Sequence, residues 1–380
     1  MKIAAALLAA ALCAPAFADV SALVAIEPTA RVDGLRVTRS ALEASLGRLL
    51  GQTVNVTTTE DLTDALRSTR SNGYDLFIGP AQIAASAIAH GYELIGSTDA
   101  EDQYVLVGRA DAAEVAALRQ RRLYLPQQDS IYTYLARGLL TAGGLSFKDL
   151  GKVEFARYPQ AGLTAISLRL TEATVVRRDD WEAWNKSNPG TTRVLATSGT
   201  VPGGFSVAVR RDMPAETRRL LVHWFENSAT AGGMKLVAEH ADLSHYRRVA
   251  ELGSFTPTRW PGVTVVNADE VKGLLAQGAR LYDTRNEKEF NQRHIPQAAF
   301  LPYHEKSLKD VVYDVSLDDF PGLKTLDPKA PTIFHCNGPE CWKSYKASRA
   351  ALAAGFTQVY WYRGGMPDWI ASGQPVASQE

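Results

Sequence analysis

The residues best suited to chemistry are two cysteines in the segment HCNGPECWKS, residues 335–344. Cys336 and Cys341 are separated by four residues, and the third cysteine of the chain, Cys13, lies near its start. A thiolate at Cys336 would be a nucleophile, and a second thiol beside it could release a bound sulfur or report oxidation as a disulfide. The pair is local in the sequence, which indicates a local purpose.

Two other interpretations of the cysteine pair stay open. One is an inert disulfide that bridges the loop, which an oxidising compartment would permit. The other is zinc bound by both cysteines with His335 or His294, although the paired-ligand spacing of structural zinc sites is missing. No metal and no cofactor are expected.

The elements around Cys336 explain why its thiol would be reactive. Residues 331–336 (PTIFHC) are typical of a buried strand, and a helix is expected at about 343–354. Ligands gather at the carboxyl ends of strands in open α/β sheets. A loop rich in Gly and Pro can turn its N–H groups inward, and the positive end of the next helix points the same way. Both effects lower the pKa of a thiol. The loop residues expected to surround the sulfur are Asn337, Gly338, Glu340, Trp342 and Ser344, with Lys343 as a nearby cation.

Three separated blocks resemble the rhodanese (sulfurtransferase) family over residues 262–377. They are LYDTRNEKEFNQRHIPQAAFLP (281–302), the cysteine segment, and YWYRGGMPDW followed by GQPV (360–376). The resemblance implies a three-layer α/β domain in which Cys336 carries sulfane sulfur as a persulfide. It also implies a thiosulfate-like anion as donor and a thiol as acceptor. Asp283 and Arg285 are expected to support the site, tying a strand end to the loop.

The cysteine loop departs from the family pattern in two ways. Common single-domain rhodaneses have four residues between Cys and Arg, whereas six residues separate Cys336 from Lys343 and none of them is Arg. Related phosphatases and arsenate reductases need that arginine, because lysine does not supply its bidentate fork. Cys341-Trp342 resembles a periplasmic rhodanese-like group with a Cys-x-x-Cys-Trp motif, which is linked to quinoprotein-dependent alcohol oxidation. The cysteine spacing here is longer.

The region before the rhodanese-like segment alternates short strands and helices, which indicates an α/β fold. It resembles a periplasmic solute-binding protein for phosphate, phosphite or phosphonates. The segments that carry this resemblance are 75–82, 102–111, 129–140 and 197–214. The resemblance implies two lobes with a ligand in the cleft between them. Residues up to about 107 and from about 203 are expected to form one lobe, and those between to form the other.

The best candidate ligand contacts are Ser130, Tyr132 and Thr133, at the start of an expected helix. Free N–H groups and hydroxyls there suit a small, phosphate-like oxyanion. Alternatively Ser130 is only a helix N-cap and Tyr132 packs in the core.

The N-terminus and the composition indicate where the protein works in the cell. Lys2, an apolar run and the cleavage pattern Ala16-Phe17-Ala18 indicate a signal peptide over residues 1–18 and a periplasmic protein. The apolar run is shorter than the roughly 20 residues of a membrane span, so an integral membrane protein is not expected. The formal net charge is zero, which gives no indication of nucleic-acid binding.

The predicted organisation is therefore a signal peptide (1–18), a two-lobed binding-protein-like domain (19–252), a linker (253–261) and a rhodanese-like domain (262–377). The function expected from this organisation is an exported sulfurtransferase with a small-anion-binding domain. The alternative is a non-catalytic periplasmic binding or redox-sensing accessory protein with a Cys336–Cys341 disulfide.

Overall fold

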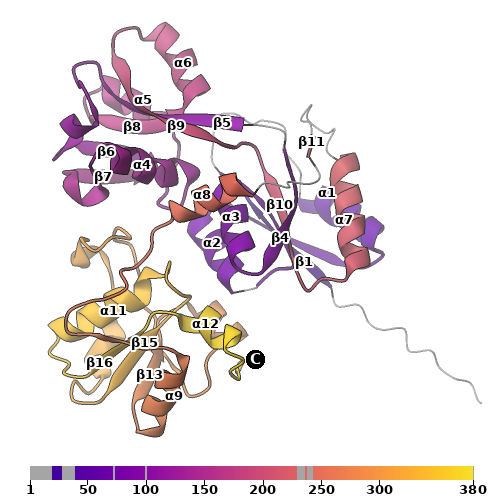
Figure 1. Cartoon of the computed structure of the whole chain (residues 1–380), viewed down its shortest axis with the longest axis vertical. Coiled ribbons are helices and arrows are strands. Elements are labelled where there is room, and N and C mark those ends of the chain that lie inside the picture. The colour runs from indigo at the N-terminus through magenta and orange to yellow at the C-terminus, as the bar shows by residue number, and fades with distance from the viewer. Residues whose placement is uncertain are drawn as a thin grey trace, which may run out of the picture.

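The computed structural model describes residues 19–27, 39–71, 73–98, 101–228, 236–237 and 243–379. The strands among these residues form three sheets, one of six strands and two of five. Figure 1 shows a separate body around each sheet, with the C-terminal body in orange and yellow. The expected signal peptide lies outside the described residues.

The first sheet combines strands from both ends of the N-terminal region, in the order β11-β4-β10-β3-β1-β2. β1 runs parallel to β2 and β3, whereas β10 runs antiparallel between β3 and β4. Helices α1 and α7 pack on one face, and α2 and α3 on the other. The strands are β1 (Val20–Ala25), β2 (Val54–Thr59), β3 (Leu76–Gly79), β4 (Tyr92–Thr98), β10 (Ser206–Arg210) and β11 (Leu236–Val237). The helices are α1 (Arg39–Leu50), α2 (Leu62–Arg70), α3 (Ala81–Ala89), α7 (Ala215–Ser228) and α8 (Ser244–Glu251).

The second sheet has the order β7-β6-β8-β5-β9 and forms the other lobe. β5 pairs antiparallel with β9 along its whole length, starting at Glu101 opposite Pro202, and with β8 from Tyr104 to Gly108. The expected lobe boundary at about residue 107 is therefore wrong, because β5 belongs entirely to the second lobe. The strands are β5 (Glu101–Arg109), β6 (Arg122–Pro126), β7 (Lys152–Ala156), β8 (Ala173–Arg177) and β9 (Thr192–Pro202). The helices are α4 (Ile131–Ala142), α5 (Ala161–Ser167) and α6 (Arg178–Ser187), with short 3-10 turns η1 (Val115–Leu118) and η2 (Phe147–Asp149).

The third sheet is parallel throughout, in the order β12-β16-β15-β13-β14. Every residue of the central strand β15 is buried, as expected for a strand with helices over both faces. The strands are β12 (Thr264–Val265), β13 (Arg280–Asp283), β14 (Ala299–Phe300), β15 (Thr332–His335) and β16 (Val359–Tyr362). The helices are α9 (Ala268–Ala276), α10 (Glu287–Gln292), α11 (Trp342–Ala353) and α12 (Gly365–Ala371), with short 3-10 turns η3 (Val315–Leu317) and η4 (Pro321–Thr325).

The helices complete a three-layer arrangement around this third sheet. α11 packs on the face that carries Phe334, and α9 and α12 pack on the face that carries Ile333. Trp369 of α12 lies in that second core. The α/β fold class expected from the sequence, two lobes followed by a separate three-layer domain, is confirmed.

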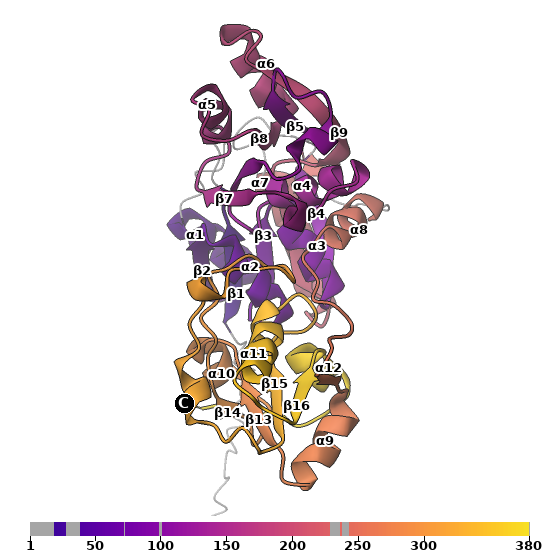
Figure 2. The same ribbon diagram turned by 90° about the vertical axis from the view of Figure 1, so that its left-hand side faces the viewer.

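The segment expected to be a linker packs against the C-terminal domain. Thr256 donates hydrogen bonds from its N–H and its hydroxyl to the carbonyl oxygen of Pro339, at 2.8 and 2.7 Å. The indole of Trp342 donates to the carbonyl oxygen of Ser254 at 3.0 Å. Pro339 and Trp342 belong to the cysteine segment, so the linker lies directly against it. Figure 2 shows α2 of the first lobe above α11 of the C-terminal domain.

Candidate functional site

Cys336 follows directly on the carboxyl end of β15 and forms a disulfide with Cys341. Both side chains are buried, with exposed fractions of 1% and 6%. The Gly364-Gly365 pair of the expected motif has a steric role here. Gly365 has a φ of +56°, and a Cβ on it would lie 2.0 Å from the carbonyl oxygen of Cys336. The chain can therefore pass tightly over the end of β15 only with glycine at this position.

The surroundings of the Cys336 sulfur differ from the expected ring of inward N–H groups. Among the described residues, the sulfur contacts the carbonyl oxygen of Cys341 at 3.2 Å and the hydroxyl of Ser344 at 3.1 Å. The N–H of Cys341 instead donates to the carbonyl oxygen of Gly338 at 3.0 Å. A disulfide sulfur carries no negative charge, so nothing in this state draws the amides inward.

Asp283 and Arg285 form a buried ion pair beneath the loop. The Nε and Nη2 atoms of Arg285 donate to the Asp283 carboxylate at 2.9 and 2.6 Å, and Nη1 donates to Asn337 at 3.2 Å. Burial works to raise the pKa of Asp283, but neighbouring positive charge outweighs it and the pKa is lowered. Burial lowers the pKa of adjacent His335 to about 4. His335 is then neutral at pH 7, which leaves Arg285 as the effective partner. The pair positions Asn337 and does not touch sulfur.

The other side of the loop faces helix α2 of the N-terminal domain. Arg70 forms an ion pair with Glu340 at 2.7 Å, and both side chains are largely buried. Asn337 donates to Glu289 of α10. Lys343, in the first turn of α11, is 9% exposed, and burial together with the nearby charge of Arg67 lowers its pKa. The expected site residues of the loop therefore come together at the boundary between the two domains.

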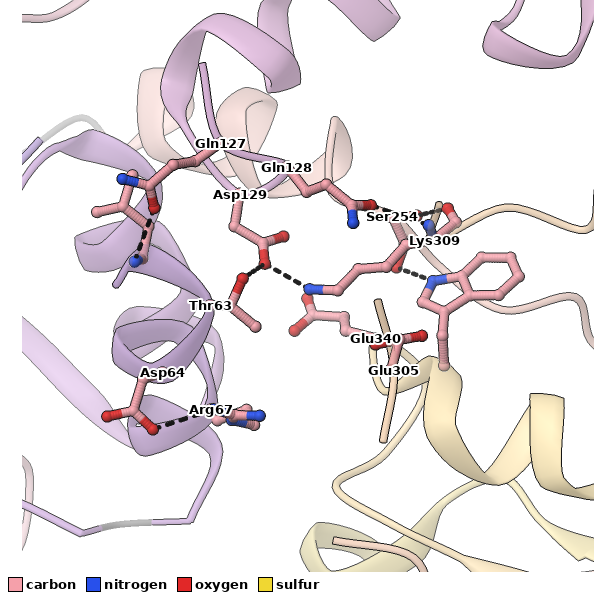
Figure 3. Close-up of polar contacts among 12 residues, drawn as sticks. Thr63, Asp64, Arg67, Gln127, Gln128, Asp129, Ser254, Glu305, Lys309 and Glu340 are labelled. Atoms are coloured by element: carbon pink, nitrogen blue, oxygen red, sulfur yellow. Dashed lines mark hydrogen bonds and ion pairs between the residues drawn. The ribbon is translucent and has the colours of Figure 1, made fainter. Parts of the chain in front are cut away.

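A second set of contacts fixes this boundary and is drawn in Figure 3. The Asp129 carboxylate accepts a hydrogen bond from Thr63 at 2.6 Å and binds the ammonium group of Lys309. Burial alone would raise the pKa of Asp129, but Lys309 outweighs this effect and the pKa is about 2. The N–H of Lys309 also donates to Gln128 at 2.9 Å. Residues of both lobes and of the C-terminal domain thus meet here.

The hydroxyls expected to hold an oxyanion are used within the fold. Ser130 is the N-cap of α4: its Oγ accepts from the Thr133 N–H at 3.2 Å and donates to the carbonyl oxygen of Pro126 at 3.1 Å. Thr133 donates to the carbonyl oxygen of Gln127 at 2.8 Å. Tyr132 packs edge-on against Tyr104, with ring centroids 5.1 Å apart.

Glu27 lies at the start of α4, and the sequence interpretation missed it. Its Oε1 accepts from the Ile131 N–H at 2.8 Å and from Gln82 Nε2 at 3.5 Å. The side chain is half-buried, and desolvation raises its pKa to about 8. A carboxyl group of the chain itself therefore occupies the first free N–H of the helix. The signal in the sequence was a polar residue just beyond a buried strand, where ligands collect.

Two kinds of feature are absent from the described residues. No helix there is both long and apolar enough to cross a bilayer. No group of three or more potential metal-ligating side chains is found there either.

Comparisons with known proteins agree with both halves of this description. The family model of the rhodanese-like domain matches residues 267–372. The model for the phosphonate periplasmic substrate-binding proteins of ABC transporters matches residues 24–250. A search of curated proteins found no match.

Several solved structures are similar to the N-terminal region. PhnD1 from Prochlorococcus marinus, in complex with methylphosphonate, is 14% identical, with 62% of this chain and 97% of that chain covered and a TM-score of 0.48. The binding-protein component of an ABC phosphonate transporter from Pseudomonas aeruginosa is 13% identical, with coverages of 62% and 93% and a TM-score of 0.44. The phosphonate model alone spans more than half of the chain, so the protein belongs to the phosphonate-type periplasmic substrate-binding family, and it carries a rhodanese-like domain at its carboxyl end.

Proposed function

We propose that this protein is exported through a leader at residues 1–18 and handles sulfane sulfur by a dithiol–disulfide cycle on Cys336 and Cys341. The observation that supports it is the disulfide between these two residues, which lies inside the segment that the rhodanese-like domain model matches. Cys336 is the sulfur acceptor and Cys341 is the resolving thiol. Lys343 supplies positive charge to the donor anion.

The cycle starts from the reduced pair. The Cys336 thiolate attacks the outer sulfur of thiosulfate, the sulfur–sulfur bond of the donor breaks, and sulfite leaves with the electron pair. The Cys341 thiolate then attacks the Cys336 sulfur of the persulfide. A disulfide forms and hydrosulfide leaves. An external dithiol reduces the disulfide by exchange and is itself oxidised to a disulfide.

The test measures both products on the reduced, full-length protein. With thiosulfate and no added reductant, each molecule is expected to release one sulfite and one sulfide and to end with the Cys336–Cys341 disulfide. With a dithiol reductant present, turnover continues. If the reduced protein releases no sulfite from thiosulfate, the sulfurtransferase proposal is wrong.

A second candidate function is a non-catalytic accessory protein whose disulfide is permanent. The burial of both sulfurs and the cover of Thr256 over Pro339 favour it. Thiol titration of protein purified without reductant separates the two functions. A disulfide that stays intact under native conditions with a dithiol reductant indicates the accessory, whereas rapid reduction supports the cycle.

We also propose that the N-terminal domain binds a small phosphonate-like anion near Glu27, with this side chain protonated. Burial raises the pKa of Glu27 to about 8. Burial also raises the pKa values of Tyr104 and Tyr132, and the charge of nearby Glu27 adds to both shifts. A neutral carboxyl can donate a hydrogen bond to an oxyanion. An ionised one repels it.

This proposal predicts the pH dependence of binding. The affinity for methylphosphonate should fall as the pH rises through about 8, by up to about tenfold per pH unit above that value. Glu27→Gln keeps a neutral side chain, so its affinity should follow only the ionisation of methylphosphonate itself over the same range. Calorimetric titration of both proteins measures this effect. Equal pH profiles of the two proteins would contradict the proposal.

A further inference from the structure

The cysteine loop contains no arginine, but helix α2 of the N-terminal domain brings two to it. Arg70 holds Glu340 inside the loop at 2.7 Å. Arg67, one turn earlier, lies on the side of α2 that faces the C-terminal domain (Figure 3). Its charge lowers the pKa of Lys343, and it also interacts with Glu289, which is hydrogen-bonded to Asn337 beside Cys336. The two domains therefore share the surroundings of the loop.

Three groups at this boundary could donate hydrogen bonds or supply positive charge to a bound anion. Among the described residues, the Lys343 ammonium group has neither a hydrogen bond nor an ion pair, although the residue as a whole is only 9% exposed; its Nζ keeps some contact with solvent. Within the part of the chain that the structure describes, the Nε atom of Arg67 is buried without a partner, whereas its Nη2 binds Asp64 at 3.1 Å. The twelve-residue helix α11 begins at Trp342, and its N-cap residue, Cys341, makes no side-chain hydrogen bond to the first-turn amides in the described structure. A buried donor without a partner, here the Arg67 Nε, is costly unless a ligand satisfies it.

We propose that Arg67 of the binding-protein domain, with Lys343 and the N-terminus of α11, completes an oxyanion site over Cys336 at the domain boundary. Its ligand is the sulfonate-like group of a sulfur donor, such as the three oxygens of thiosulfate. A guanidinium group recognises such a group with paired hydrogen bonds that lysine alone does not supply. The arginine that is absent from the loop is thus replaced by one from another domain.

The chemical role of this site rests on the proposed function. When the Cys336 thiolate takes the outer sulfur of the donor, the electron pair and the negative charge leave on sulfite. Positive charge from Arg67 and Lys343 stabilises that departing anion. A site shared by two domains requires that the loop be held against its neighbours. The linker is held by a hydrogen bond to Pro339, and α2 is held by a hydrogen bond to Glu340.

The test uses alkylation and does not depend on sulfur transfer. In a reduced, full-length Cys341→Ser protein, the rates of Cys336 modification by iodoacetate and by neutral iodoacetamide are compared on the peptide containing Cys336, by mass spectrometry. The two reagents are similar in size, but only iodoacetate is charged, so the ratio of their rates reports the local positive charge. Adding Arg67→Gln or Lys343→Gln should lower the iodoacetate-to-iodoacetamide rate ratio about five- to tenfold, with little change for iodoacetamide.

Arg121→Gln is the matched control, since Arg121 is an exposed arginine of the second lobe, and it should leave the ratio unchanged. The proposal is overturned if Arg67→Gln leaves the ratio unchanged, or if neither reagent modifies Cys336 in the folded protein. If the wild type transfers sulfur but Arg67→Gln does not change the rate ratio, the proposed function stands and the oxyanion site shared by the two domains is wrong. If the ratio falls but no sulfite is released from thiosulfate, the site stands and the sulfurtransferase proposal is wrong.

Discussion

Cys341→Ser is expected to abolish sulfide release while a single turnover of sulfite release remains, so that persulfide accumulates on Cys336. The variant keeps the nucleophile at the end of β15 but lacks the thiol that attacks the persulfide. Serine does not form a disulfide, and its hydroxyl is a far weaker nucleophile than a thiolate at neutral pH. Sulfide release should fall at least about a thousandfold. Mass spectrometry of the peptide with Cys336 should find one added sulfur atom.

Cys336→Ser is the necessary comparison, and it should release neither sulfite nor sulfide. The two variants therefore separate the two steps, since one removes sulfur acceptance and the other removes only resolution. Sulfide release by Cys341→Ser at the wild-type rate, without an external thiol, would show that Cys341 is not the resolving residue. An unmodified Cys336 peptide in that variant would contradict sulfur acceptance itself.

The sequence predicted the strand, loop and helix around Cys336 well, because local patterns determine them, but it did not predict the contacts of the sulfur itself. The apolar segment before Cys336 could only be a buried strand, and the following loop and helix occur where expected. The Gly-Gly pair was recognised only as part of a motif. Its steric role follows from the fold and not from the local sequence, because the atom that a Cβ on Gly365 would meet belongs to Cys336 at the end of another strand.

The contacts that cover the loop could not be predicted in the same way. Arg70 and Glu340 are 270 residues apart in the chain. Neither hydrophobic periodicity nor turn signals report which distant surfaces meet. The same limit applies at α4, where the sequence indicated free N–H groups at the helix start. It did not indicate that Glu27, more than a hundred residues earlier, would bind the first of them. Residues 253–261 have the composition of a linker. This composition predicts an irregular backbone, but it does not predict that the segment packs against the cysteine loop.

Asp283→Asn is expected to destabilise the C-terminal sheet by about 3–5 kcal/mol, because it leaves the Arg285 charge buried without its carboxylate. Asp283 is fully buried and Arg285 is 2% exposed, so water does not replace the lost partner. Asn337 and the carbonyl oxygen of Arg293 would still accept hydrogen bonds from the guanidinium group, but neither carries a negative charge. Hydrogen exchange at β13 and β15 measures the free energy of unfolding of this sheet.

Two comparisons show whether the buried charge causes this loss. Asp269→Asn removes one partner of the exposed Asp269–Lys272 pair and should cost less than about 1 kcal/mol. The double variant Asp283→Leu, Arg285→Met removes both charges and should recover much of the loss.

The stabilisation of the C-terminal sheet by Asp283 should also depend on pH. The folded pKa of Asp283 is lowered, so its contribution is present above 3.8, the ordinary pKa of an aspartate, and disappears as the pH falls through the folded value. His335, with its pKa lowered from 6.5 to about 4, likewise favours the fold at high pH and loses that contribution between these values. Below about pH 4 the gap between the wild type and Asp283→Asn should therefore narrow. A gap that stays constant into acid would show that Asp283 stabilises the sheet through its shape and hydrogen bonds, without any contribution from its charge.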